Sequence, residues 1–269
     1  MTPPRVIACS IALILSIVLG VAAAYVWKRH AQFIRLENTL SKVATLDHAM
    51  REKICAHRCN NIPMYRDALR YFDCIEMDIH IQPPAGGPDA VYHPPAENNH
   101  GLTLQTLLNN ERLPKRRLWL DVKDLSESNW GPFLDRLTHL IPSARRADVI
   151  VETVWSDLAV QPAAAAFRSK GFAFSYYVPT EEAMACGATQ SQACDALRRQ
   201  VLSTASMGFS HLSFDARTFP FVRSIRAELP PAMRLLTWDL TKAWPRTDLI
   251  NAVDVYIINF PSPHADRHN

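Results

Sequence analysis

Six ionisable residues with the chemistry of a hydrolytic site lie in the first half of the chain. They are His57, Glu76, Asp78, His93, Asp121 and Lys123. Carboxylate oxygens are the ligands that Mg²⁺ and Ca²⁺ prefer, and a histidine, with an ordinary pKa of about 6.5, can give or take a proton near neutral pH. Phosphodiester cleavage needs a cation to offset phosphate charge, a base and an acid. These residue types indicate such a reaction if the fold brings them together.

The segment 74–81, CIEMDIHI, carries two of these carboxylates. It alternates apolar and ionisable residues, as a β-strand with two different faces does. Glu76 and Asp78 then point the same way, about 7 Å apart at a rise of about 3.3 Å per residue. Two such carboxylates repel each other, so either a Lys or Arg neutralises them in a structural ion pair or a divalent cation binds them. The strand alone leaves both alternatives open.

Short apolar runs alternate with longer periodic stretches after residue 52. The runs predict strands at 53–58, 74–81, 117–123, 148–153, 172–177, 210–216, 233–240 and 253–260, and the stretches between them predict helices at 64–71, 104–110, 130–140, 158–170, 193–207, 219–228 and 241–251. Such alternation is typical of parallel strands joined by helices, and eight units in about 220 residues fit a closed (β/α)8 TIM-type barrel. The alternative is an open doubly wound sheet, which is weaker because no Gly-rich turn follows any strand.

In a barrel of this kind the C-terminal ends of the strands share one mouth. His57 ends the first strand, His93 follows the second, and Asp121 and Lys123 end the third, so we expect one pocket. Two further residues near His57 have alternative roles. Arg58 either clamps a phosphate or pairs with Glu76, and Asn60 either orients the site or caps the next helix.

Other polar residues at strand ends are given structural roles. We expect Glu152, Asp215 and Asn259 to form hydrogen bonds inside the barrel. His80 is expected at the rim or in a loop, and His100 in the turn before Gly101.

The motifs AHRCNN (56–61), CIEMDIHI (74–81), VYHPPAENNHGLTLQTLL (91–108) and LWLDVKDL (118–125) resemble the glycerophosphodiester phosphodiesterase-like superfamily of phospholipase-type barrels. HPPA, LTLQ and LDVK fit its menorin-like branch best. The resemblance covers residues 54–125, and later segments such as FSYYVPT and LLTWDL fall where these barrels have their later strands. Cys59 and Asn60 replace the usual Gly and Glu-Asn-Thr segment, and the 19-residue spacing from His57 to Glu76 is similar to sphingomyelinase D-like members.

The resemblance implies a division of roles among these residues. It makes His57 and His93 the catalytic acid and base, Glu76, Asp78 and Asp121 the ligands of Mg²⁺ or Ca²⁺, Lys123 a phosphate contact, and Trp238 part of the substrate mouth. The expected activity is metal-dependent hydrolysis of a phosphoric diester, in a phospholipid or lipid-derived head group. A non-catalytic, menorin-like binding barrel at the membrane surface is the alternative, and an unrelated metal-dependent barrel hydrolase is a third.

The N-terminus has a different character from the rest of the chain. Residues 6–27 carry no charge, and 22 residues suffice to span a bilayer. We expect a transmembrane anchor, or else a cleaved signal peptide, in 1–30, a linker helix in 31–51 and the barrel in 52–269. The expected partners are therefore a membrane, through this helix, and a phosphodiester small molecule.

Charge and cysteine content bear on partners and location. The net charge is +3 without a basic stripe, so we expect no nucleic acid. Cys186 and Cys194, eight residues apart, either close a small disulfide loop or stay as two thiols. Basic residues after the apolar segment favour a cytoplasmic barrel, while the cysteine pair favours an extracytoplasmic one, which we expect.

Overall fold

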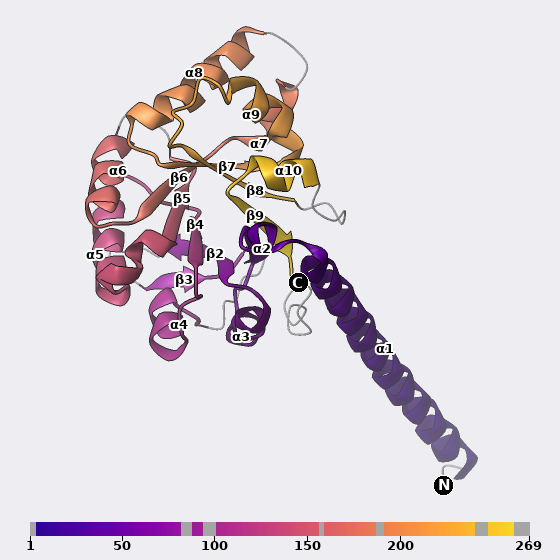
Figure 1. The fold of residues 1–269 in the computed structure, drawn as a ribbon. Helices are drawn as coiled ribbons and strands as arrows, with labels where there is room; N and C mark the ends of the chain where they lie inside the picture. Colours follow the sequence, from indigo (N-terminus) through magenta and orange to yellow (C-terminus); the bar gives the residue numbers. More distant parts are fainter. Residues whose placement is uncertain are drawn as a thin grey trace.

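The computed structural model describes residues 4–81, 88–93, 101–155, 159–186, 191–239 and 247–260. All eight predicted strands are present and pair in parallel around a closed TIM-type barrel (Figure 1). They are β1 (Ile54–His57), β2 (Cys74–Ile81), β4 (Arg117–Val122), β5 (Val149–Thr153), β6 (Ala173–Tyr177), β7 (His211–Asp215), β8 (Arg234–Trp238) and β9 (Val255–Asn259). β9 pairs with β1, and β1 pairs with β2, which closes the barrel.

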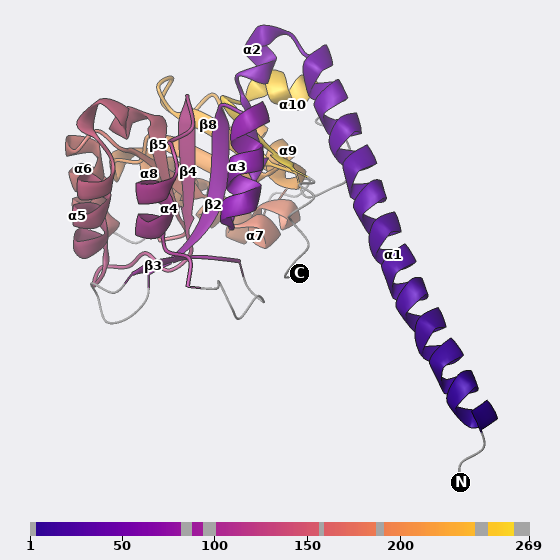
Figure 2. The same cartoon turned by 90° about the horizontal axis from the view of Figure 1, so that it is seen from below.

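The predicted helices are present as well and surround the strands (Figures 1 and 2). They are α3 (Ile62–Tyr71), α4 (Leu104–Asn110), α5 (Trp130–Leu140), α6 (Val160–Ser169), α8 (Gln192–Ser206), α9 (Phe219–Ile225) and α10 (Thr247–Ala252). Residue 158 and residues 241–246, at the start of the helices predicted at 158–170 and 241–251, lie outside the described residues. Asn61, rather than Asn60, caps α3, because its side-chain oxygen accepts a hydrogen bond from the Met64 backbone N–H at 2.8 Å.

Four short elements were not predicted. They are β3 (Asp89–Val91), which pairs antiparallel with β2, the 3₁₀ helices η1 (Ser143–Asp148) and η2 (Ala216–Thr218), and α7 (Thr180–Ala185). Each has six residues or fewer, which is too few for the repeated periodicity that distinguishes a helix or a strand in a sequence.

Side-chain alternation along the strands builds two separate apolar layers. Ile75, Met77 and Ile79 of β2 are fully buried in the layer between strands and helices, as the alternation predicted. The opposite face of the strands fills the barrel interior with a smaller cluster made of Cys55, Cys74, Trp119, Ile150, Leu236, Val255 and Ile257. Glu76 and Asp78 share this inner face, above the cluster.

A single helix, α1 (Pro4–Thr45), covers most of the two N-terminal segments and extends away from the barrel (Figure 2). The short α2 (His48–Arg51) follows it. Leu36 of α1 is buried, and Leu40 and Val43 pack against the core, so the C-terminal part of this helix is fastened to the barrel. Among the described residues, we find no helix with both the length and the apolar character of a membrane span.

Two disulfides link described residues. Cys186, at the end of α7, is bonded to Cys194 in α8, so the disulfide alternative for this pair is confirmed. Cys55 is bonded to Cys74 inside the barrel, a pairing that was not predicted.

Candidate active site

A cavity of about 310 Å³ opens at the C-terminal ends of the strands. It is lined by His57, Arg58, Glu76, Asp78, Trp119, Asp121, Lys123, Glu152, Val154, Tyr177, Trp238 and Ile257. Seven of the nine predicted site residues are in this lining, and the other two, Asn60 and His93, bond to lining residues. The expected common pocket is therefore present.

Strand register brings the carboxylates together. Asp78 of β2 pairs in register with Asp121 of β4, and Asp121 pairs with Glu152 of β5, so three neighbouring strands carry acids at one level. Ligand oxygens of Glu76, Asp78 and Asp121 all lie within 4.8 Å of one another. Burial is nearly complete for Glu76, Asp78 and Glu152, so little solvent screens their repulsion.

Lys123 and Asn60 bind the two carboxylate oxygens of Asp78. The Lys123 ammonium lies 2.9 Å from Asp78 Oδ1 and also contacts Asp121, while the Asn60 amide donates to Asp78 Oδ2 at 2.7 Å. Asn60 Oδ1 accepts in return from the Asp78 backbone N–H at 3.0 Å. Burial would raise the pKa of Asp78, but Lys123 and Asn60 outweigh it and hold the pKa below its ordinary value. Asn60 thus orients the site, as one of its two alternatives predicted.

The surroundings raise the pKa of the other three carboxyl groups, those of Glu76, Asp121 and Glu152. Burial, followed by the charges of Asp78 and Asp121, raises the pKa of Glu76 well above its ordinary value. Burial raises the pKa of Asp121 despite Lys123, and burial with the charge of Asp121 does the same for Glu152. One oxygen of Glu152 has no hydrogen-bond partner among the described residues. The ionised forms of these three carboxyl groups are therefore disfavoured in the protein alone.

His57 is held as a neutral imidazole with one nitrogen toward the carboxylates. Its Nδ1 lies 2.8 Å from Asn259 Oδ1, an acceptor, so Nδ1 carries the proton and Nε2 keeps its lone pair. Nε2 is 3.7 Å from Glu76 Oε2. Burial lowers the pKa of His57 to about 4, with the Asn259 hydrogen bond acting in the opposite direction. At neutral pH His57 is therefore unprotonated at Nε2.

Arg58 connects Glu76 to His93, one of the two predicted catalytic histidines. It is the described non-glycine residue with a left-handed backbone, at φ 53°, a conformation that costs about 1–3 kcal/mol. This turn directs its backbone N–H to Glu76 Oε2 at 2.7 Å and its guanidinium Nη2 to His93 Nε2 at 2.8 Å. The pairing with Glu76 is thus made by the backbone, and the charged group faces His93. Because Nη2 is a donor, His93 Nε2 accepts and is unprotonated here.

An aromatic pair forms the side of the cavity beyond Glu152. The rings of Tyr177 and Trp238 stack with centroids 5.0 Å apart, and Val154 lies exposed nearby in the lining. Trp238 lies in the cavity lining, the position predicted from the sequence. Tyr177 was missed, although it ends its strand on the same face as Ser175 and strand parity would have found it.

The remaining expectations have mixed outcomes. Asn259 bonds inside the barrel, as expected, and so does Glu152, through Ser213. Asp215 instead pairs locally with Arg217 at 2.8 Å and caps η2, because the chain turns directly after β7. His80 belongs to β2 itself and stacks on Tyr92 with centroids 4.3 Å apart. His100 lies outside the described residues.

Comparison with known proteins identifies the fold. No protein-family profile and no curated protein sequence match the chain. Among solved structures, a glycerophosphodiester phosphodiesterase from Parabacteroides distasonis ATCC 8503 matches with a TM-score of 0.53 and 14% identity, over 77% of this chain and 92% of that one. A glycerophosphodiester phosphodiesterase from Agrobacterium tumefaciens str. C58 matches at 0.48 and 14%, over 78% and 97%. The chain therefore shares the TIM-type barrel fold of the Parabacteroides distasonis enzyme.

The donor set at the mouth of this barrel fits a hard divalent cation. Glu76, Asp78 and Asp121 offer carboxylate oxygens within 4.8 Å of one another, and such oxygens suit hard cations such as Mg²⁺ and Ca²⁺. Burial, and after it the charges of neighbouring carboxylates, raises the pKa of Glu76 and of Asp121, and a bound cation would favour the ionised form of both. Lys123 already bridges Asp78 and Asp121, so the ion-pair alternative of the sequence is present too. Among the described residues, no Lys or Arg side chain forms an ion pair with Glu76.

Proposed function

We propose that the protein is a metal-dependent phosphoric diester hydrolase that acts on a phospholipid or a lipid-derived head group. The observation that carries this proposal is the convergence of three carboxylates, a neutral His57 and two cationic side chains on one cavity. Such a set combines a hard-metal site with a base and with phosphate-binding groups. The fold shared with the phosphodiesterases supports the reaction class by analogy.

The cation would be held by Glu76, Asp78 and Asp121. When bound, it would neutralise charge on the phosphate and on the developing transition state. Lys123 and Arg58 both line the cavity and carry positive charge, and a phosphate oxygen would accept hydrogen bonds from them. Tyr177 and Trp238 would hold the apolar or alcohol part of the substrate away from water.

His57 is proposed as the general base. The nucleophile, either water or a hydroxyl of the substrate, loses its proton to His57 Nε2 as its oxygen bonds to phosphorus. Asn259 keeps the imidazole in the tautomer that leaves Nε2 unprotonated. His93 is proposed as the acid: when a phosphate draws the Arg58 guanidinium to itself, His93 Nε2 is freed to take up a proton and deliver it to the leaving oxygen as the P–O bond breaks.

Turnover of a simple diester tests the proposal. The full chain should hydrolyse bis-p-nitrophenyl phosphate or a lysophospholipid with Mg²⁺ or Ca²⁺, and a chelator should stop it. His57→Ala and His93→Ala should each lower kcat by about 10²–10⁴-fold. His139→Ala, on the outer surface of α5, is the matched control and should behave as wild type. Absence of metal-stimulated turnover on every diester would instead favour the menorin-like binding barrel.

We also propose that α1 tethers the barrel to a membrane, with the barrel outside the cytoplasm. Large apolar side chains of α1 between Ile14 and Trp27 are exposed to solvent in the isolated chain, and a lipid surface would cover them. Fractionation of cells expressing the full chain tests the tether. Alkaline phosphatase fused after Asn269 tests sidedness, and an inactive fusion would contradict the extracytoplasmic placement.

A further inference from the structure

The barrel closes at a weak junction between β1 and β2. The ladder of β1 with β9 runs along all of β1, from Ile54 to His57, and the ladder of β2 with β4 runs from Cys74 to Ile79. Between β1 and β2, by contrast, the register within these described strands consists of Ala56 opposite Ile75 alone. Backbone pairing therefore holds this pair of strands less firmly than either strand is held on its other side.

The same two strands carry the centre of the candidate site. His57 ends β1, and Glu76 and Asp78 lie on β2, so the His57–Glu76 distance spans the weak junction. Above the junction, at the mouth, the two strands are linked by bonds that belong to the site. The Cys59 backbone N–H donates to Glu76 O at 3.0 Å, and the Arg58 N–H donates to Glu76 Oε2 at 2.7 Å.

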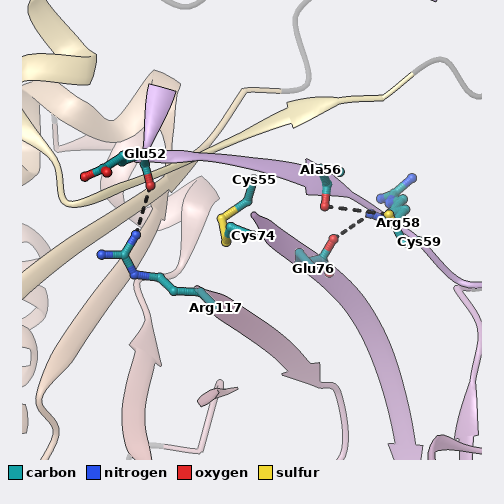
Figure 3. The surroundings of a disulfide bond; sticks show 8 residues. All are labelled: Glu52, Cys55, Ala56, Arg58, Cys59, Cys74, Glu76 and Arg117. Atoms are coloured by element: carbon teal, nitrogen blue, oxygen red, sulfur yellow. Dashed lines mark hydrogen bonds between the residues drawn. A yellow bond between two sulfur atoms is a disulfide. The ribbon is translucent and has the colours of Figure 1, made fainter. Parts of the chain in front are cut away.

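Below the junction the link is covalent. Cys55 lies two residues before His57 and Cys74 two residues before Glu76, so both sulfurs point into the barrel beneath those side chains. Their Cα atoms are 4.5 Å apart, and both residues are fully buried in the inner apolar cluster. Figure 3 shows the disulfide between the strands, with the Arg117–Glu52 contact on one side and Glu76 with Arg58 on the other.

We propose that the Cys55–Cys74 disulfide is a positioning cross-link that sets the His57–Glu76 geometry, so that divalent-cation binding and turnover are stronger in its oxidised form. This inference rests on the proposed function and adds a redox condition to it. Reduction breaks the S–S bond and adds two electrons and two protons, which a dithiol supplies as it forms its own disulfide. The β1–β2 junction then keeps its single register pair and the bonds at the mouth.

The second disulfide provides the matched control. Cys186–Cys194 joins α7 to α8 on the outside of the barrel, and neither residue is in the cavity lining. Its removal also takes one disulfide from the protein, but it changes no residue of β1 or β2. Cys59, the described free cysteine, is present in every variant and gives a constant thiol background.

The first test compares Cys55→Ala/Cys74→Ala with Cys186→Ala/Cys194→Ala in the full chain. Calorimetric titration with Mg²⁺ and Ca²⁺ should show about 10- to 100-fold weaker binding for the first variant, as is typical when a supporting contact of a metal ligand is lost. The surface variant should bind as wild type. A general loss of folding would appear in circular dichroism, whereas a positioning role also shifts the pH profile of turnover through His57. Wild-type affinity and pH profile in the folded Cys55→Ala/Cys74→Ala variant would overturn the proposal.

A second test uses wild-type protein and keeps the proposal falsifiable if that variant does not fold. Because coupling between two equilibria is reciprocal, saturating Ca²⁺ should make Cys55–Cys74 harder to reduce in dithiothreitol redox buffers and leave Cys186–Cys194 unchanged, as read by alkylation and mass spectrometry. Equal shifts for the two disulfides, or none, would contradict the cross-link. Failure of the proposed function looks different: oxidised wild type would then neither bind the cations nor hydrolyse diesters.

Discussion

At the N-terminal end of the barrel, Arg234 of β8 pairs with Asp254 at 2.8 Å, and Asp254 also accepts from the Leu235 N–H at 2.9 Å. At the C-terminal end, Glu76, Asp78 and Asp121 crowd within 4.8 Å, and Lys123 contacts only two of them. At the first end this pair of opposite charges is compensated within the protein and adds a small amount of stability. The second end gathers negative charge at a cost in stability, as sites for ligands commonly do.

The largest expected effect comes from changing one carboxylate at the C-terminal end. Asp121→Asn removes a cation ligand, so metal-stimulated turnover should fall by more than about 100-fold, beyond what outer-shell changes cost. Its unfolding midpoint should stay equal or rise, because a repelling charge is removed. Turnover and thermal unfolding of the same sample measure both. A destabilised Asp121→Asn protein with full turnover would contradict the proposed difference between the two ends of the barrel.

Acid should weaken the fold through the N-terminal end. His211, at the start of β7, bonds to Ser210 at 2.8 Å, and burial lowers its pKa to about 4. Since the ordinary pKa is about 6.5, the unfolded chain takes up this proton first, and stability falls as pH drops from about 6.5 to 4. Asp254 faces His211 and opposes the shift, while Arg234 and Arg117 reinforce it.

Urea unfolding at several pH values checks this prediction. His211→Gln should lose part of the acid sensitivity in that window. The rest should persist, because His57 has a lowered pKa of about 4 as well and contributes with the same sign. An unchanged slope in His211→Gln would show that His211 is not the source.

A smaller loss is expected when the compensated pair is broken. Asp254→Ala removes the acceptor of the Leu235 N–H and leaves Arg234 unpaired at a largely exposed position, which should cost about 1 kcal/mol. For a domain of this size, that corresponds to about 2–4 °C in Tm. Turnover should be unchanged, and a loss of activity in Asp254→Ala would contradict the separation of the two ends.

The smallest effect concerns the aromatic side of the cavity. Trp238→Leu loses the stacking on Tyr177, worth about 0.5–1.5 kcal/mol. If Trp238 acts in substrate binding, KM should rise a few-fold to about tenfold with kcat nearly constant. A fall in kcat at constant KM would place Trp238 in the chemistry instead.

Sequence reasoning captured the barrel because parallel strands buried on both faces leave repeated apolar runs. It captured the pocket because strand parity and the common mouth determine where Glu76, Asp78 and Asp121 point. The left-handed backbone of Arg58 could not be predicted, since nothing in its residue type favours φ 53°. The contact of Arg58 with His93 depends on that turn, so it could not be predicted from the sequence either.

The internal disulfide was missed for a different reason. Cys55 and Cys74 have a spacing that suggests nothing by itself, since sequence alone does not determine pairing. The parity that places His57 and Glu76 in the barrel also places these two cysteines there, and this signal was available. The register that brings β1 beside β2 with their sulfurs in reach had to come from the structure.

The contrast between the two ends rests on the claim that the carboxylates of the C-terminal mouth are gathered for a divalent cation. Calorimetric titration of chelator-treated full-length protein with Mg²⁺ and Ca²⁺ tests it most directly. The account predicts saturable binding of one cation per chain, lost in Asp121→Asn and retained in Asp254→Ala. No saturable binding, or binding that Asp121→Asn leaves intact, would contradict it.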